Sequence, residues 1–243
     1  MPIQHERGYL IPAVNTDTVD YVDCADRLAD SIRHWHPAAN ITIVTKDMLP
    51  HGDLGGYAND WQMFQISPYR QTIKLEADMI AATPVDHWWT MFEHRDLVIS
   101  QGCRTIYNKP SESRFYRKVF DANNLPDVYN AITYWRLSKT AQEFFNTVRS
   151  IFENWDQYRK MLKFPEDTPS TDVVYATAAT IMGVETVTLP PGYGPTIVHM
   201  KRYHQPIQGD DWTQELVWEN DPVRINTVAQ FGFVHYHIKD WQL

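Results

Sequence analysis

The chain has 243 residues and a formal net charge of −8, with 43% hydrophobic and 21% charged residues. These proportions exclude a disordered chain, and the acidic balance argues against general electrostatic binding of nucleic acid. Two cysteines exclude a disulfide framework or a cysteine zinc site, and they fit a reducing, cytoplasmic setting. The N-terminus is charged where a signal peptide is apolar, and no apolar run approaches the ~20 residues of a membrane span.

The first part of the chain predicts a strand–helix–strand unit, with a strand over 8–14, an amphipathic helix over 20–35 and a strand over 41–44. Such a crossover joins parallel strands. The turn that starts at Asn15, Thr16 and Asp17 and runs to Tyr21 therefore lies at a strand's carboxyl end and a helix N-terminus, where anionic or nucleotide ligands bind. Neither a Gly-x-Gly-x-x-Gly loop nor a Walker-type loop is present, so dinucleotide and ATPase functions are not supported.

Residues 71–80 are the most informative stretch. Apolar and polar residues alternate over 72–77, which predicts a strand, and residues 81–84 end it. Glu76 and Asp78 occupy alternate positions at this strand end and face the same side. Two such carboxylates repel each other unless a cation or proton lies between them, and hard oxygen ligands suit Mg²⁺ or Mn²⁺. The alternative interpretation is a solvated strand end.

The remaining patterns predict alternating helices and strands in an α/β fold without repeats or linkers. They comprise a short helix before Pro68, a helix over 84–92, strands over 96–100 and 129–135, helices over 139–159 and from about 170, an edge strand over 186–189, and a tail over 231–241. We expect a single domain over residues 1–243.

Several of these segments together resemble GT-A glycosyltransferases, and within them the glycogenin-like family. Residues 69–78 (YRQTIKLEAD) resemble the family's Tyr-x-Lys-x-x-x-x-Asp-Ala-Asp run, and residues 85–89 resemble the Ile-Asp-Asp-Leu-Phe that follows it. Further similarities are Tyr129-Asn130 to the start of Phe-Asn-Ser-Gly, Thr171-Asp172 to Gly-Asp-Gln, Val234-His235 to Val-His, and residues 239–241 to Lys-Pro-Trp.

The resemblance implies a single GT-A-like domain whose mixed, mostly parallel sheet is flanked by helices. It also implies metal-dependent transfer of a sugar from a nucleotide sugar, a UDP-sugar, with retention. Mn²⁺ or Mg²⁺ would be held by Glu76, Asp78 and either His235 or His237. Implied nucleotide contacts are Asn15, Thr16, Asp17, Tyr21 over the uracil ring, Arg70, Glu76 and Lys239. Asp172 and Asn130 are the implied catalytic residues, with Asp172 orienting donor sugar or acceptor.

The chain also departs from the family pattern. Glu76 replaces an aspartate, Gln71 a lysine and Val173 a glutamine, and Ala131-Ile132 stand in place of Ser-Gly. His235 and His237 alternate, so on an extended segment both face the site while Val234, Tyr236 and Ile238 face the core. Other roles are open for the remaining residues: Asn15, Thr16 and Asp172 as helix caps, Tyr21 as a core residue.

The acceptor stays open among a glycan, a small molecule, a protein side chain and a hydroxymethylated base of phage DNA, the last in a host cytoplasm. A nucleotidyltransferase that makes nucleotide sugars is a second interpretation, but residues 13–16 lack the Gly-rich basic loop it needs. A third is a non-catalytic nucleotide-sugar-binding or scaffold protein, favoured by Glu76, Ile132 and Val173.

Overall fold

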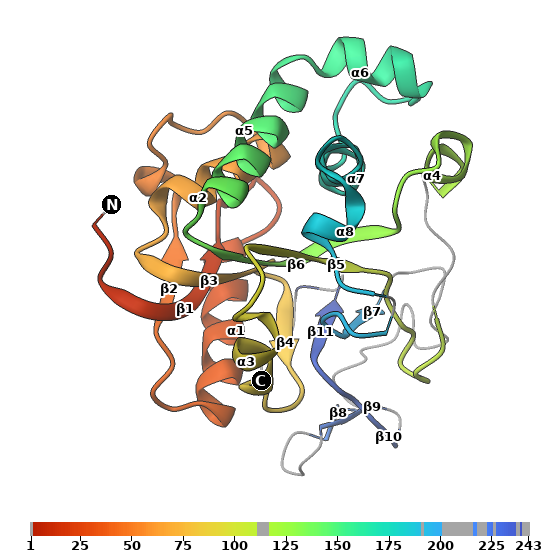
Figure 1. The fold of residues 1–243 in the computed structure, drawn as a ribbon. Helices are drawn as coiled ribbons and strands as arrows, with labels where there is room; N and C mark the ends of the chain where they lie inside the picture. The colour runs from red at the N-terminus through yellow and green to blue at the C-terminus, as the bar shows by residue number, and fades with distance from the viewer. Residues whose placement is uncertain are drawn as a thin grey trace.

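The computed structural model describes residues 2–110, 117–190, 192–200, 216–217, 223–225, 227–236 and 239. Its centre is a five-stranded sheet in the order β2-β1-β3-β6-β5 (Figure 1). The strands are β1 (His5–Pro12), β2 (Ile41–Val44), β3 (Tyr69–Leu75), β5 (Leu97–Gln101) and β6 (Val128–Arg136). β1 pairs in parallel with β2 and β3, whereas β6 pairs antiparallel with β3 and β5. The predicted α/β class and mixed, mostly parallel sheet are confirmed.

Helices cover both faces of this sheet. They are α1 (Tyr21–Trp35), α2 (Met63–Ile66), α3 (His87–Phe92), α4 (Arg117–Asn123), α5 (Lys139–Glu153), α6 (Trp155–Leu162), α7 (Thr171–Met182) and α8 (Val184–Val187), with short 3₁₀ turns η1 (Lys46–Met48) and η2 (Gly56–Gln62). Figure 1 shows α1 and α3 on one side of the sheet and α2, α5 and α7 on the other. Side chains of a strand alternate between faces, so Tyr9 and Ile11 pack in the core beside α1, while Leu10 packs in the core beside α5 and α7.

The predicted strand–helix–strand unit is confirmed. The Asp20 carboxylate caps α1 by accepting hydrogen bonds from the backbone N–H groups of Val22 and Asp23, both at 3.1 Å. Leu28 and Ile32 are fully buried on the inner face of the helix. The parallel pairing of β1 and β2 brings the start of α1 to the carboxyl edge of the sheet.

A second, three-stranded sheet carries the C-terminal tail to the same region. It has the order β4-β11-β7 and is built from β4 (Met79–Ala81), β11 (Phe233–Tyr236) and β7 (Ile197–Met200). Gly232 enters β11 with φ of +74°, and a Cβ atom there would lie 2.3 Å from the carbonyl oxygen of Thr196, so only glycine fits this position. A third sheet pairs β8 (Leu216–Val217), β9 (Arg224–Ile225) and β10 (Val228–Ala229).

Two predicted elements differ from the structure. The helix expected over 139–159 is divided into α5 and α6 at Asn154, whose side-chain amide donates to the carbonyl oxygen of Ser150 at 2.8 Å. The edge strand expected over 186–189 is wrong, because α8 occupies 184–187. There the hydroxyl and backbone N–H of Thr188 both donate to the carbonyl oxygen of Val184, which closes a helical turn in spite of the β-branched residues.

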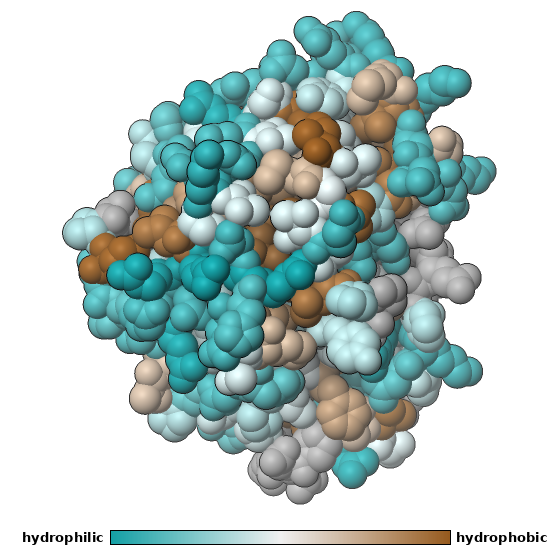
Figure 2. Space-filling view, in the orientation of Figure 1, coloured by the Kyte–Doolittle hydropathy of each residue, from teal (hydrophilic) through white to brown (hydrophobic). Residues whose placement is uncertain are grey.

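The face of the molecule seen in Figure 2 is largely hydrophilic, and its hydrophobic side chains form separate small groups. Within the part of the chain that the structure describes, no helix is both long enough and apolar enough to cross a membrane.

Candidate functional site

A cleft of about 800 Å³ opens where several strands of the central sheet begin or end. β1, β2 and β3 are parallel, so their carboxyl ends share one edge, and the antiparallel β6 starts at that edge. Of the residues that the sequence singled out, the cleft is lined by Asn15, Thr16, Tyr21, Glu76, Asp78, Asp172, His235 and Lys239. This is the edge at which open α/β sheets bind ligands.

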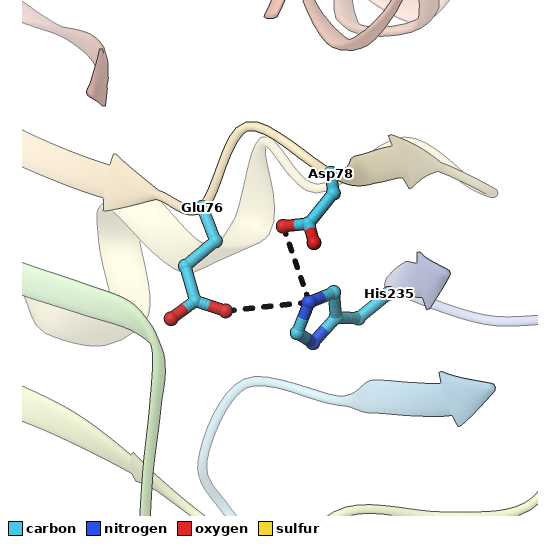
Figure 3. Close-up of side chains that lie close together, drawn as sticks. All are labelled: Glu76, Asp78 and His235. Atoms are coloured by element: carbon cyan, nitrogen blue, oxygen red, sulfur yellow. Dashed lines mark ion pairs between the residues drawn. The ribbon is translucent and has the colours of Figure 1, made fainter. Parts of the chain in front are cut away.

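Glu76, Asp78 and His235 converge on one point of the cleft. Nε2 of His235 lies 3.2 Å from Oδ1 of Asp78 and 3.4 Å from Oε2 of Glu76. Figure 3 shows both carboxylates directed toward this same nitrogen. One ligand atom from each of the three side chains lies within 4.8 Å of the others.

Backbone pairing explains why the three side chains meet. β3 ends at Leu75, one residue before Glu76, so the pair lies in the bend between β3 and β4, at a strand end as predicted. β11 pairs antiparallel with β4 with His235 opposite Met79, the residue after Asp78. The backbone N–H of Tyr236 also donates to the carbonyl oxygen of Asp78 at 3.1 Å. Hydrogen bonds therefore hold β11, which carries His235, directly beside the bend that carries Glu76 and Asp78 (the acidic bend).

This donor set fits a divalent cation. Two carboxylates and one imidazole are oxygen and nitrogen ligands of the kind that Mn²⁺ accepts, and Mg²⁺ accepts the carboxylates. His235 is buried among core residues of β11, since Val234 and Tyr236 on either side pack into the core as expected. His237, the alternative ligand, lies outside the described residues.

Lys239 contacts the carboxylate oxygen of Asp78 that does not face His235. Its Nζ donates to Oδ2 of Asp78 at 2.6 Å and to the hydroxyl of Tyr21 at 3.0 Å, and it lies 4.4 Å from the centroid of the Tyr21 ring. Arg27 of α1 holds the same segment by donating to the Lys239 carbonyl oxygen at 3.2 Å. A cationic group and an aromatic ring thus stand next to the acidic bend at the N-terminus of α1.

The two carboxylates differ in their electrostatic environment. Burial raises the pKa of Glu76, against the lowering effect of His235, and the charge of Asp78 adds to the rise. Burial also opposes ionisation of Asp78, but the charge and hydrogen bond of His235, and then Lys239, hold its pKa below the usual range. Burial alone would lower the pKa of Lys239, yet Asp78 and Tyr21 raise it to about 12. Glu76 thus keeps a raised pKa even beside His235, and a divalent cation bound at this point would favour its ionised form.

The turn before α1 serves the helix as well as the cleft. Oδ1 of Asn15 accepts a hydrogen bond from the backbone N–H of Val22 at 3.0 Å, and Oγ1 of Thr16 accepts one from Val19 at 3.1 Å. Both residues line the cleft, whereas Asp17 is not among the lining residues. Asn15 therefore supports the N-terminus of α1 in addition to the cap residue Asp20, whereas the Thr16 bond stays within the turn, before the helix begins.

Asp172 and Asn130 are adjacent, but only Asp172 reaches the cleft. The Asp172 side chain, in the first turn of α7, accepts a hydrogen bond from the backbone N–H of Asn130 at 2.7 Å. Asn130 is fully buried: Nδ2 of its side chain donates to Asp60 at 3.3 Å, and Oδ1 of its side chain accepts from the Thr133 hydroxyl at 2.7 Å. Asn130 thus contacts its neighbours inside the fold and is not among the residues that line the cleft, which contradicts the predicted catalytic contact with substrate.

A buried ion pair that was not predicted from the sequence also lines the cleft. Nζ of Lys74 donates to Oδ1 of Asp60 at 2.7 Å, and Lys74 is only 1% exposed. Oδ2 of Asp60 accepts from the Tyr175 hydroxyl as well as from Asn130. The position of Lys74 two residues before Glu76, on the same side of the strand, is the signal that could have identified it. Ile132 and Val173 are two of the positions at which the chain departs from the family pattern. Both are fully buried core residues and do not line the cleft.

Arg70, predicted as a phosphate contact, is wrong on geometry. It lies at the opposite end of β3 from Glu76, and six residues of strand span about 20 Å. Its Nε instead pairs with Oε2 of Glu6 at 3.2 Å on the exposed surface, and it is not among the residues lining the cleft.

Comparisons with known proteins match the fold. No family model and no curated protein matches the sequence. Among solved structures, galactosyltransferase LgtC in complex with donor and acceptor sugar analogues aligns with a TM-score of 0.52 and 12% identity over 94% of this chain and 86% of that chain. Mouse xyloside xylosyltransferase 1 aligns with a TM-score of 0.52 and 11% identity over 99% of this chain and 100% of that chain.

The bifunctional glycosyltransferase WbbM aligns with a TM-score of 0.53 and 11% identity over 95% of this chain and 45% of that chain. Identities this low bear on the fold alone, so membership of the glycogenin-like family stays a prediction of the sequence. The strand order, the cleft at the carboxyl edge and these similarities agree: the chain has the fold of the GT-A glycosyltransferases.

Proposed function

We propose that the protein is a metal-dependent glycosyltransferase that moves a sugar from a UDP-sugar to a hydroxyl acceptor. One observation carries the proposal: Glu76, Asp78 and His235 bring ligand atoms within 4.8 Å of one another in the cleft of a GT-A fold, with Lys239 2.6 Å from Asp78. Separate segments of the chain supply these four groups, and surface acids that merely keep a strand end soluble need no such convergence.

The chemistry requires these groups. Cleavage of a sugar–diphosphate bond leaves negative charge on the departing nucleoside diphosphate. Mn²⁺ or Mg²⁺ bound by Glu76, Asp78 and His235 would supply positive charge beside that leaving group. Lys239 adds a fixed ammonium group, and Tyr21 next to it offers a ring face for the uracil. Asp172 and the Lys74–Asp60 pair line the same cleft and are placed to contact the donor sugar or the acceptor.

The charge of the cleft favours an acceptor without negative charge. Six carboxylates line it, from Asp53, Asp60, Glu76, Asp78, Glu166 and Asp172. The two lysines that line it, Lys74 and Lys239, are each already paired with one of these acids. Because the charges of a divalent cation and a diphosphate largely cancel, the remaining field is negative and repels a polyanion. A glycan or small hydroxyl compound is therefore favoured over the phage DNA acceptor.

A melting experiment tests the donor assignment. UDP with Mn²⁺ is expected to raise the melting temperature well beyond the sum of their separate effects, because the diphosphate and the cation share the same ligands. A ligand that binds only the folded state at a hundredfold excess over its Kd stabilises that state by about 2.7 kcal/mol. Slow release of UDP from a UDP-sugar in the same mixture separates an enzyme from a non-catalytic binding protein. The donor assignment is wrong if no nucleoside diphosphate shifts the melting temperature in the presence of Mn²⁺.

Replacing Lys239 with alanine separates nucleotide binding from metal binding. Loss of a hydrogen bond to a charged group costs about 1.5–3 kcal/mol, so the affinity for UDP at saturating Mn²⁺ is expected to fall about 10- to 100-fold. The affinity for Mn²⁺ alone should not fall, because Oδ2 of Asp78 loses a competing cation. Calorimetric titration of UDP, and separately of Mn²⁺, measures both values. A parallel loss of both affinities would contradict this separation of roles.

A further inference from the structure

Two histidines lie side by side behind the acidic bend because of strand register. β7 and β11 are parallel, with Val198 opposite Val234 and His199 opposite His235. The two imidazole rings have centroids 5.1 Å apart and are nearly perpendicular, at 89°. His199 is 2% exposed and His235 6% exposed, so neither ring is a surface group.

Tyr129, at the start of β6, bridges these two rings. Its hydroxyl is in hydrogen-bond contact with Nδ1 of His235 and with Nδ1 of His199. Tyr129 is 5% exposed. Phenylalanine holds this place in the family that the sequence resembles, so the resemblance does not imply the hydroxyl group.

Counting hydrogens gives these contacts a direction. A phenol has one hydrogen to donate and can accept others, and a neutral imidazole carries its single hydrogen on one of its two nitrogens. Nε2 of His235 faces Asp78 and Glu76, so it needs a free lone pair in order to bind a cation. The hydrogen of His235 then sits on Nδ1 and is donated to the oxygen of Tyr129. The hydroxyl of Tyr129 in turn donates its own hydrogen bond to Nδ1 of His199.

We propose that Tyr129 is a positioning residue that fixes the tautomer and the ring orientation of His235 for a divalent cation, with His199 accepting the hydrogen bond of the Tyr129 hydroxyl. The inference rests on the proposed metal site. Groups that hydrogen-bond the second nitrogen of a metal-binding histidine orient the ring and raise its basicity, and their removal costs about 10- to 100-fold in metal affinity. In Tyr129→Phe the buried Nδ1–H of His235 has lost this acceptor, so the tautomer with a free Nε2 becomes less favourable.

The experiment measures Mn²⁺ binding to the purified Tyr129→Phe variant from the electron paramagnetic resonance signal of unbound Mn²⁺. Neither nucleotide nor turnover is needed. The expected result is a Kd for Mn²⁺ raised about 10- to 100-fold, with an unchanged Kd for UDP at saturating Mn²⁺. Tyr134→Phe is the matched control. Tyr134 is a buried tyrosine on the same strand, and its hydroxyl donates to Gln71 at 3.2 Å, near the start of β3 and so at the opposite end of that strand from Glu76. The control should bind Mn²⁺ like the wild type.

His199→Phe provides a second measurement, which decides the question if Tyr129→Phe does not fold. This variant keeps a ring in the buried site and removes the acceptor of the Tyr129 hydroxyl, so it is expected to raise the Kd for Mn²⁺, but by less than Tyr129→Phe does. Unchanged Mn²⁺ affinity in the folded variants, or an equal loss in Tyr134→Phe, overturns the positioning role. Absence of Mn²⁺ binding to the wild type is a distinct result, because it overturns the proposed metal site itself.

Discussion

Asp78→Asn is expected to lower the rate of UDP release from a UDP-sugar by about 100-fold or more while the protein remains folded. Asp78 contacts both tail groups of the site, with Oδ1 toward His235 and Oδ2 toward Lys239. Asparagine keeps the size of the side chain and an acceptor oxygen but removes its charge. Loss of one group that stabilises developing charge typically costs about 10²- to 10³-fold in rate, and loss of a cation ligand adds to this cost.

UDP release at saturating Mn²⁺ and urea unfolding of the same samples measure the two effects. Asp30→Asn is a suitable control, because Asp30 is an exposed acid on α1 whose carboxylate pairs with the exposed Arg33. Its turnover should equal that of the wild type, and its free energy of unfolding should lie within about 0.5 kcal/mol of the wild-type value. An Asp78→Asn protein with wild-type turnover would refute the role assigned to the acidic bend.

Asp60→Ala is expected to reduce the free energy of unfolding by about 3–5 kcal/mol, the largest stability effect we predict. Lys74 is 1% exposed and the Asp60 side chain 12% exposed, so the substitution leaves a buried ammonium group without its carboxylate. The hydroxyl of Tyr175 and the amide of Asn130 lose the same acceptor. Urea denaturation gives the difference directly.

A second substitution tests whether the uncompensated charge causes this loss. In Asp60→Ala with Lys74→Met the buried ammonium is also gone, so part of the stability should return. Arg70 on the same strand provides an exposed comparison, since its pair with Glu6 is more than half exposed on both sides. Glu6→Ala should cost less than about 1 kcal/mol. A similarly small cost for Asp60→Ala would contradict the account of a buried pair.

Local patterns predicted those elements whose stability depends on nearby residues. The capped amphipathic helix α1 and the parallel strands on either side of it followed from residues 8–44 alone. The division between α5 and α6 did not, because the apolar spacing of Phe144, Val148, Ile151 and Trp155 continues across Asn154. The turn α8 was mistaken for a strand because its β-branched residues favour strands, whereas hydrogen bonds to Val184 fix the helical form.

The site was predicted where its residues are close in sequence or where, as at His235 and Lys239, they match motifs of the family that the chain resembles. Glu76 and Asp78 are two residues apart, so their proximity could be inferred without the fold. Lys74 and Asp60 are 14 residues apart and meet only because helices cover both faces of β3, which buries polar positions that look solvent-facing in the sequence. His199 reaches His235 only through the register of β7 with β11.

Anomalous diffraction from crystals containing Mn²⁺ and UDP tests the central claim most directly. We expect one strong manganese peak in the cleft, within ligand distance of Asp78, Glu76 and Nε2 of His235, with the diphosphate on the open side of the ion and Lys239 beside it. A diphosphate bound in the cleft with no manganese at these three side chains, or manganese bound only elsewhere at saturating concentration, would contradict the account.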